Sequence, residues 1–234
     1  TSRRVRLTRP GQLFLPEAQQ TLAQAERAVQ AAREAHRGEI GHLSLGYTTS
    51  GPFVPIVAGA LYRFRQSYPR VELRLHELPN DEQIVQVENR QLDIGLLRKF
   101  RPPALPAGIE RRMLLEENMV LVVHQGHRLA QRNSDPSIAD LKDEPLVLYA
   151  PTRVAGFHEH FFGLCRKEGF VPNVAQEASS LASLLGLVAA GFGATIVGQS
   201  HGRLHLDNLS SRPRSDPVTS RLWLIHNENL SPPA

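Results

Sequence analysis

This chain of 234 residues contains one cysteine and has no long uninterrupted hydrophobic run. The single thiol, Cys165, excludes an internal disulfide framework and suits a reducing compartment. The most apolar stretch, Leu181–Gly198, is broken by glycines and is too short to span a membrane. The first ten residues are rich in arginine and lack the apolar core of a secretion signal. These absences predict a soluble cytoplasmic protein that does not associate with membranes.

Motifs for nucleophilic catalysis, dinucleotide binding and metal coordination are also missing. No Gly-x-Ser-x-Gly elbow is present, so Ser50 lacks the setting of a hydrolase nucleophile. The Gly191–Gly193 stretch precedes a predicted strand, whereas a dinucleotide-binding loop follows one. Two pairs of histidines lack the spacing of a metal site, and we expect them at the surface. These pairs are His158 with His160 and His124 with His127. The sequence therefore predicts no metal, no other cofactor and no enzymatic activity.

Positive charge is concentrated at the start of the chain. Residues 1–37 hold seven arginines and three glutamates, whereas the remainder holds 20 basic and 20 acidic residues. The net charge of +4 therefore lies in the N-terminal segment, which suggests an acidic polymer such as nucleic acid as a partner. A solvated basic helix face is the alternative. The cluster of Arg3, Arg4 and Arg6 favours contacts with DNA phosphates.

Residues 12–37 are predicted to form a linker and dimerisation helix. Small and apolar residues recur there at alternating spacings of three and four, which is a heptad pattern. The residues of this seam are Leu15, Ala18, Leu22, Ala25, Val29 and Ala32. The alanines allow a partner helix to approach closely. A helix lying on its own globular body is the alternative, but the stripe is narrow and the other faces are charged.

Residues 42–65 combine a strand, a cluster of hydroxyl groups and a helix. Alternation over residues 43–47 predicts the strand, and helical spacing over residues 53–64 predicts the helix. Thr48, Thr49 and Ser50 lie between them, with Ser50 as the expected N-cap and a proline in the first turn. Free N–H groups and the helix dipole would make this end a site for a carboxylate. Alternatively, Ser50 only caps its helix.

The rest of the chain alternates between strand-like and helix-like segments. This order favours a parallel sheet with right-handed crossovers, and hence two α/β lobes joined by crossing strands. We expect the ligand in the cleft, at the carboxyl ends of the strands. The predicted strands are 71–75, 93–97, 111–115, 119–124, 145–149, 171–177, 194–197, a segment near Leu209, and 221–226. One predicted helix follows Pro79, and the others cover 137–141, 157–165 and 181–190.

Arg98 follows directly after the predicted strand 93–97. Its guanidinium can hold a carboxylate through two parallel hydrogen bonds. An ion pair with a nearby acid such as Glu82 or Asp93 is equally compatible with the sequence. The pattern alone leaves both interpretations open.

Several stretches, taken in order, resemble those of LysR-type transcriptional regulators. They are Leu7–Gly11, which resembles the wing-to-linker motif, and the landmarks Phe64 to Pro69, Leu92–Gly95, His124 to Ala130 and Val188–Gly193. The resemblance covers essentially the whole chain and lies in order and spacing. It implies an α/β effector-binding domain over 42–234, with two Rossmann-like lobes of periplasmic-binding-protein type after the linker helix. Lobe I would comprise about 42–114 and 218–234, and lobe II about 115–217. Residues 1–11 would be a remnant of the winged helix-turn-helix, with the DNA-binding domain largely absent and the family's last helix missing.

Within the family, the chain is most similar to regulators of aromatic-compound degradation that respond to benzoate or muconate. The stretches concerned are Gly46–Ser50, Asp81–Gln83, Leu148 to Phe157 and Leu185–Gly191. The resemblance implies an aromatic or unsaturated carboxylate as inducer. The residues that it implies around this ligand are Thr49, Ser50, Asn80, Arg98 and Phe157. Two departures affect the pocket: the helix start after Ser50 is about two residues shorter, and Val197 and Gly198 replace an apolar residue followed by proline.

The resemblance also implies how such a protein would work. An inducer bound between the lobes would change their closure, and so the pairing of dimers within a tetramer and the spacing of the DNA-binding heads. The partners would be a small organic acid, DNA through the full-length protein, and other copies of the chain. This fragment alone would bind operator DNA weakly or not at all. A stand-alone two-lobed solute-binding protein is the alternative, although the basic linker helix and the missing signal peptide count against it. An enzyme is the third possibility, because the sequence shows no set of acid–base or nucleophilic residues that would come together in one site.

Overall fold

The computed structural model describes residues 7–36, 38–151, 156–202, 204, 206–216 and 218–228. These residues form two compact units. The first contains helix α1 (Arg9–His36) and residues Tyr68–Glu72, and the second contains Leu43–Ser67 and the described residues between Leu73 and Leu230. None of the helices in the described ranges is long and apolar enough to cross a membrane.

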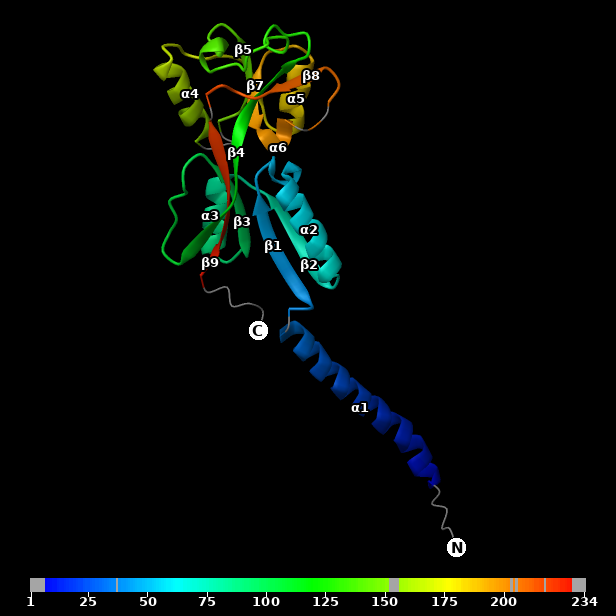
Figure 1. The fold of residues 1–234 in the computed structure, drawn as a ribbon. Helices are drawn as coiled ribbons and strands as arrows, with labels where there is room; N and C mark the ends of the chain where they lie inside the picture. The colour runs from blue at the N-terminus through cyan, green and yellow to red at the C-terminus, as the bar shows by residue number, and fades with distance from the viewer. Residues whose placement is uncertain are drawn as a thin grey trace. The chain divides into compact units, whose positions relative to one another are not determined.

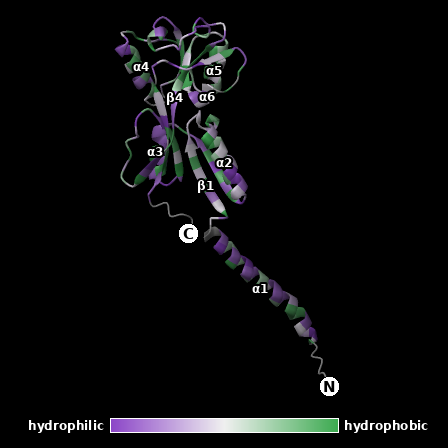
Figure 2. Cartoon of the chain, in the orientation of Figure 1, coloured by the Kyte–Doolittle hydropathy of each residue, from purple (hydrophilic) through white to green (hydrophobic). Residues whose placement is uncertain are grey.

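The predicted long helix is confirmed as α1, which begins at Arg9. The Thr8 hydroxyl accepts a hydrogen bond from the Gly11 N–H at 3.3 Å and so caps the first turn. Hydrophilic and hydrophobic residues are interspersed along the helix (Figure 2). Two large side chains of the predicted seam are largely exposed, with 66% of Leu22 and 52% of Val29 accessible to solvent. In the same unit, Arg70 forms ion pairs with Glu34 and Glu39 at 2.7 and 3.4 Å.

The second unit is built on a mixed sheet with the strand order β2-β1-β3-β9-β4-β7, in which β8 also pairs with β4 (Figure 1). A separate parallel pair, β5 and β6, is linked to the segment before β7 by a bridge between Leu146 and Ala194. The strands are β1 (Gly41–Tyr47), β2 (Val71–Glu77), β3 (Ile94–Lys99), β4 (Ile109–His124), β5 (Pro145–Tyr149), β6 (Asn173–Ala178), β7 (Thr195–Gly198), β8 (Leu209–Arg212) and β9 (Thr219–Asn227).

Helices cover this sheet in two groups, each with its own hydrophobic core (Figure 1). In lobe I, α2 and α3 contribute Val57 and Val87 to clusters built on β1, β3 and β9. In lobe II, α4 and α5 contribute Phe161 and Leu184 to clusters built on β4, β5 and β7. The helices are α2 (Pro55–Ser67), α3 (Asn80–Glu88), α4 (Phe157–Lys167), α5 (Leu181–Ala189) and α6 (Gln199–Gly202), with 3-10 turns η1 (Gly51–Phe53) and η2 (Ala139–Leu141).

Strand β4 passes through both lobes. Its first part pairs antiparallel with β9 from Ile109 to Asn118, and its second part pairs with β7 and β8. The prediction of two strands here was wrong, because the polar residues at 116–118 interrupt the apolar pattern while the backbone remains extended. Glu117 lies within this polar segment and is only 8% exposed. A single strand therefore crosses between the lobes beside β9. The predicted parallel sheet is confirmed for the pair β1 and β3, whereas β9 pairs antiparallel with both β3 and β4.

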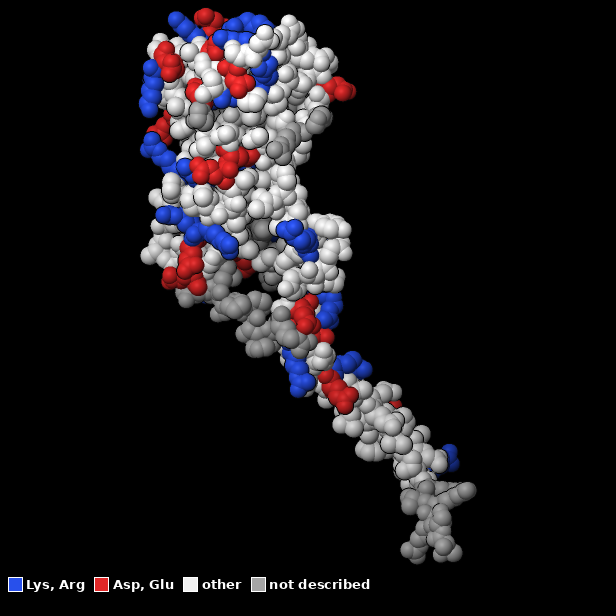
Figure 3. Space-filling view, viewed as in Figure 1, with Lys and Arg blue, Asp and Glu red and all other residues white. Residues whose placement is uncertain are grey.

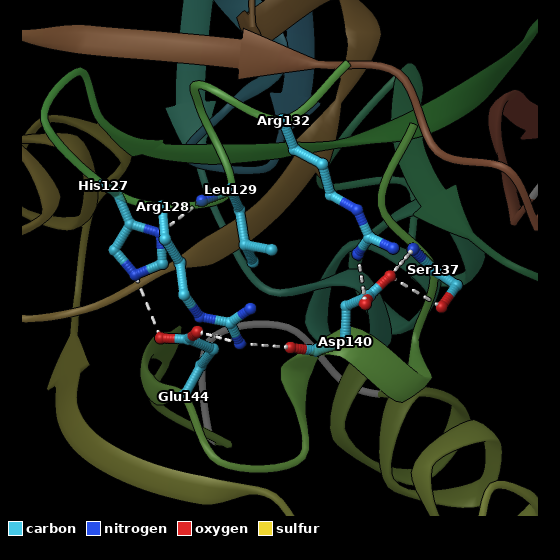
Figure 4. Close-up of polar contacts among 7 residues, drawn as sticks. All are labelled: His127, Arg128, Leu129, Arg132, Ser137, Asp140 and Glu144. Carbon is cyan, nitrogen blue, oxygen red and sulfur yellow. Dashed lines mark hydrogen bonds and ion pairs between the residues drawn. The ribbon is translucent and has the colours of Figure 1, made fainter. Parts of the chain in front are cut away.

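A polar network stabilises the loops of lobe II around His127 (Figure 4). The Nδ1 of His127 accepts the Leu129 N–H at 3.2 Å, so its Nε2 is the donor to Glu144, 2.9 Å away. Arg128 pairs with the same carboxylate at 2.5 Å. Asp140 accepts the Ser137 N–H at 2.8 Å and also contacts Arg132. His127 is therefore a half-buried structural residue, and the prediction that it is a surface histidine was wrong.

The other histidine pair is also half-buried. The Nε2 of His158 lies 2.5 Å from the backbone oxygen of Tyr149. The ring of His160 stacks on Phe100, with 4.4 Å between centroids and 14° between planes. The prediction failed because His158 contacts the end of β5 and His160 stacks on the segment after β3. Over the described part of the chain, no three His, Cys, Asp or Glu side chains are grouped to hold a metal.

Candidate functional site

A small cavity lies where the ends of β1, β3, β5 and β7 approach one another between the lobes. Its lining residues are Thr48, Thr49, Ser50, Asn80, Arg98, Phe100, Met119, Tyr149, Phe157, Ile196, Val197, Gly198 and His201. The structure thus brings all five predicted ligand residues to one place. The cavity measures about 40 Å³. One water needs roughly 10–15 Å³ by this measure, so an aromatic ligand requires the lobes or side chains to move.

The predicted helix start at Ser50 is wrong. Ser50 precedes the single 3-10 turn η1, its side chain makes no capping hydrogen bond, and α2 begins only at Pro55. Proline restricts the preceding residue to extended backbone, and Val54 has φ −82° and ψ 119°. The N–H groups of Gly51, Phe53 and Val54 are bonded to carbonyl groups of Thr48, Ser50 and Gly51, respectively. The expected set of free N–H groups is therefore used by the backbone itself, and side chains must supply the polar contacts of the cavity.

Asn80 is fully buried at the first turn of α3, beside the cavity. Its amide nitrogen donates to the backbone oxygen of Arg98 at 3.0 Å, and its amide oxygen accepts the Arg98 N–H at 3.1 Å. Both polar atoms of this side chain thus bind the end of β3. Asn80 consequently positions the Arg98 backbone.

Arg98 forms an ion pair with an acid that the sequence did not suggest. Its Nη1 lies 2.6 Å from Glu117 Oε1 and 2.8 Å from the Ser220 hydroxyl, so a partnership with Glu82 or Asp93 is wrong. Asp93 instead accepts the Ser44 N–H at 2.7 Å. Burial disfavours ionisation of Glu117, but hydrogen bonds from Ser200 and the charge of Arg98 outweigh it, so the pKa of this carboxyl lies below its ordinary value. The pair is therefore ionised at neutral pH.

Three buried polar atoms at the cavity have no hydrogen-bond partner within the described ranges. They are Nε and Nη2 of Arg98 and the hydroxyl of Tyr149. Both side chains are about nine-tenths buried, at 10% exposure for Arg98 and 8% for Tyr149. Burial raises the pKa of Tyr149, with the charge of Arg98 opposing it, so the phenol is a neutral donor. An unsatisfied buried donor costs roughly 1–3 kcal/mol, which a ligand oxygen would recover.

His201 of α6 was not among the predicted site residues. It is only 3% exposed, and its Nε2 lies 3.1 Å from the backbone oxygen of Ser50. Burial and the nearby Arg98 lower its pKa to about 4, against the opposing effects of Glu117 and the Ser50 carbonyl. The imidazole is therefore neutral at neutral pH and donates its Nε2–H across the lobes. A lone histidine after a buried strand gives no local signal of such a contact.

Phe157 supplies an apolar wall, as predicted for its position. It is 4% exposed, stacks on Phe161 with centroids 5.7 Å apart, and has Phe100 at 5.9 Å. Thr49 and Ser50 add hydroxyl groups to the lining, from the loop after β1. The cavity thus combines a buried arginine and hydroxyl groups with aromatic and aliphatic side chains. The predicted phosphate contacts, Arg3, Arg4 and Arg6, lie outside the described residues.

Comparison with known proteins identifies the fold and the family. The family model of the LysR substrate binding domain matches residues 36–234. The chain belongs to the LysR family. An uncharacterized HTH-type transcriptional regulator of Escherichia coli K12, YnfL, is 34% identical over 226 residues, which cover 96% of this chain and 75% of YnfL. The relatives of this LysR-type regulator are transcriptional regulators and not enzymes.

Solved structures agree with this assignment. The LysR family regulator CbnR is similar over 100% of this chain and 79% of its own, with a TM-score of 0.81 and 26% identity. The effector binding domain of BenM, solved with its effector benzoate, covers 82% of this chain and 85% of its own, with a TM-score of 0.70 and 25% identity. The predicted α/β fold of periplasmic-binding-protein type is thereby confirmed. This LysR-type transcriptional regulator contains an effector-binding domain, and its cavity between the lobes is the candidate effector site.

Proposed function

We propose that the effector of this regulator is an aromatic or unsaturated carboxylate that binds in the cavity between the lobes. The observation that carries the proposal is the pair of guanidinium nitrogens of Arg98, beside the hydroxyl of Tyr149, all without a hydrogen-bond partner among the described residues. A guanidinium edge with two free donors matches the two oxygens of a carboxylate. Benzoate is the effector in the BenM structure, which has the same fold.

Different side chains would contact different parts of the ligand. Arg98 and Tyr149 would hold the carboxylate, and the hydroxyl groups of Thr49 and Ser50 would complete its hydrogen bonds. Phe157 would pack on the apolar part of the ligand. Asn80 acts indirectly, because its amide already fixes the backbone of Arg98.

Binding of such a ligand would be coupled to lobe closure. A cavity of about 40 Å³ cannot hold a benzene ring, so the ligand would select an arrangement with a wider opening. The hydrogen bond from His201 to the Ser50 carbonyl joins the lobes and would respond to this change. Strand β4, which runs through both lobes, and its neighbour β9 would carry the rearrangement.

We further propose that the change in closure alters how copies of the chain assemble. Residues 12–37 would form a linker coiled coil, followed by the effector-binding domain over 42–234. Dimers pairing within a tetramer would then set the spacing of the DNA-binding heads, with Arg3, Arg4 and Arg6 near DNA phosphates in the cytoplasm. The alternative of a stand-alone solute-binding protein is not favoured, because the relatives are transcriptional regulators.

Isothermal titration calorimetry with three ligands tests whether the protein recognises the carboxylate of the inducer. Benzoate and cis,cis-muconate carry the carboxylate, and benzamide keeps the ring but removes the charge. We expect a carboxylate to bind at least about tenfold more tightly than benzamide, because hydrogen bonds to charged groups are worth roughly 1.5–3 kcal/mol. Equal affinity for benzoate and benzamide, or no binding of either acid, would reject the proposal.

A further inference from the structure

A second cavity lies on the other side of Phe100 from the candidate effector site. It measures about 390 Å³ and is formed by the segment that follows β3 and by helix α4. Its lining residues are Lys99, Phe100, Arg101, Pro102, Pro103, Ala104, Gly156, Glu159, His160, Gly163, Leu164, Arg166 and Lys167. This volume is within the usual range for small-molecule sites. None of the five predicted ligand residues of the effector cavity lines it.

The lining of this second cavity is strongly basic. Arg101 comes from the segment after β3, and Arg166 and Lys167 come from the last turn of α4. These three exposed side chains form no ion pair among the described residues, whereas Lys99 is paired with Asp81 at 3.0 Å. Glu159 is the single acid in the described lining. Lys and Arg side chains lie among Asp and Glu side chains along the edge of the molecule that carries α4 (Figure 3).

An aromatic stack forms a flat wall of the same cavity. The rings of Phe100 and His160 lie nearly parallel, 4.4 Å apart. Burial together with the charges of Arg101 and Lys167 lowers the pKa of His160, so its ring is neutral at neutral pH. The positive charge facing the cavity therefore belongs to the longer side chains around the stack. Such a wall accommodates a planar or compact ligand body.

We propose that this cavity is a second binding site, for a small anion that carries at least two negative charges. Basic groups approach from two sides, one from the segment after β3 and two from α4. A single carboxylate engages one of these sides, whereas a phosphorylated compound or a polycarboxylate engages both and holds the segment against the helix. Charge-assisted hydrogen bonds to phosphate and carboxylate oxygens are the contacts that arginine makes best.

Phe100 connects the two cavities, because it is a lining residue of both. It also lies 5.9 Å from Phe157, which forms a wall of the candidate effector site. An anion that fixes Phe100 from outside would therefore alter the affinity of the inner cavity, and the reverse effect must be equal in free energy. This coupling rests on the proposed function, whereas the second site itself does not.

Calorimetry with pyrophosphate, citrate and acetate at constant ionic strength tests the second site. We expect one pyrophosphate or citrate per chain and no measurable acetate binding. The double variant Arg166→Gln/Lys167→Gln should weaken the polyanion by about tenfold or more. Arg63→Gln/Arg65→Gln on α2 is the matched control, because it removes two exposed charges elsewhere and should leave the affinity unchanged. Binding of pyrophosphate but not citrate would identify the ligand as a phosphorylated compound, and the reverse result would identify it as a polycarboxylate.

Other outcomes separate this site from the proposed effector site. Three outcomes would overturn the second site. They are no polyanion binding at all, equal polyanion affinity in wild type and Arg166→Gln/Lys167→Gln, and equal weakening by the control variant. Polyanion binding without benzoate or muconate binding would support the second site and reject the proposed inducer. If both bind, titrating benzoate with and without saturating pyrophosphate measures the coupling. An unchanged benzoate affinity would overturn the coupling through Phe100.

Discussion

The Nε2 of His201 lies 3.1 Å from the backbone oxygen of Ser50, so a buried histidine of lobe II donates a hydrogen bond to lobe I. The contact joins α6 to the loop after β1, beside the ion pair of Arg98 and Glu117. A protonated imidazole is disfavoured there, because the side chain is buried and Arg98 is near. This hydrogen bond between the lobes therefore requires the neutral form of His201.

His201 should make the protein less stable in mild acid. Its pKa is about 4 in the folded protein and about 6.5 when unfolded, so the unfolded chain binds more protons between these values. The contribution is complete above pH 6.5 and falls as the pH decreases towards 4. Between pH 7 and 5 the free energy of unfolding should fall by about 2 kcal/mol from this group. Urea unfolding over this range measures the slope.

The variant His201→Gln isolates this contribution. A glutamine amide can still donate to the Ser50 carbonyl but does not titrate, so the loss between pH 7 and 5 should be smaller than in wild type. Glu117 faces the same region, but its pKa lies below its ordinary value in the folded protein, so this carboxyl stays ionised over the range. Parallel slopes for wild type and His201→Gln would show that His201 does not carry the pH dependence.

Ser50→Ala should weaken inducer binding without unfolding the protein. The serine side chain makes no capping hydrogen bond, so its removal costs little stability. Loss of one hydrogen bond to a carboxylate should reduce the affinity about tenfold to a hundredfold. Calorimetry with the best-bound acid measures this, and Ser67→Ala, at the end of α2, is the control. Unchanged affinity in Ser50→Ala would remove Ser50 from the site.

Tyr149→Phe should change stability and binding in opposite directions. The buried hydroxyl of Tyr149 has no partner in the described structure, so deleting it should leave the free energy of unfolding equal or raise it by about 1 kcal/mol. The same deletion should weaken carboxylate binding by about tenfold if the hydroxyl contacts the ligand. Urea unfolding and calorimetry provide the two readings. A less stable variant with normal affinity would assign Tyr149 a structural role instead.

Leu22→Asp should dissociate the oligomer. Leu22 is 66% exposed in the single chain, and a linker coiled coil would bury it at the seam. An aspartate there would place a charge in an apolar interface, at a cost of several kcal/mol. Light scattering should report a smaller mass than for wild type, while Gln20→Asp, on the face of the same helix away from the seam, should keep the wild-type mass. An unchanged mass for Leu22→Asp would rule out this seam.

Local patterns were sufficient to predict much of the fold. The heptad spacing around Leu22 predicts α1, and the alternation over residues 43–47 predicts β1, because side-chain periodicity follows directly from backbone geometry. The order of strands and helices predicts the two-lobed α/β architecture, since few connections between such elements are sterically favourable. The position of the cavity was also predicted, because strand ends converge in this fold, whereas the residues around it were implied by the family resemblance.

The tertiary structure alone determined which hydrogen bonds and ion pairs those residues form. The pairing of Arg98 with Glu117 spans 19 positions, and the hydrogen bond of His201 to Ser50 spans 151. Neither partner carries a local sequence signal for the other. Glu117 interrupts an apolar pattern and suggests a break, yet its ion pair lets β4 continue through both lobes. Sequence therefore determined most of the elements and which strand ends meet, although it missed the continuity of β4 and the start of α2. Packing determined which donors remain without a partner, because burial and charge pairing depend on residues brought together only by the fold.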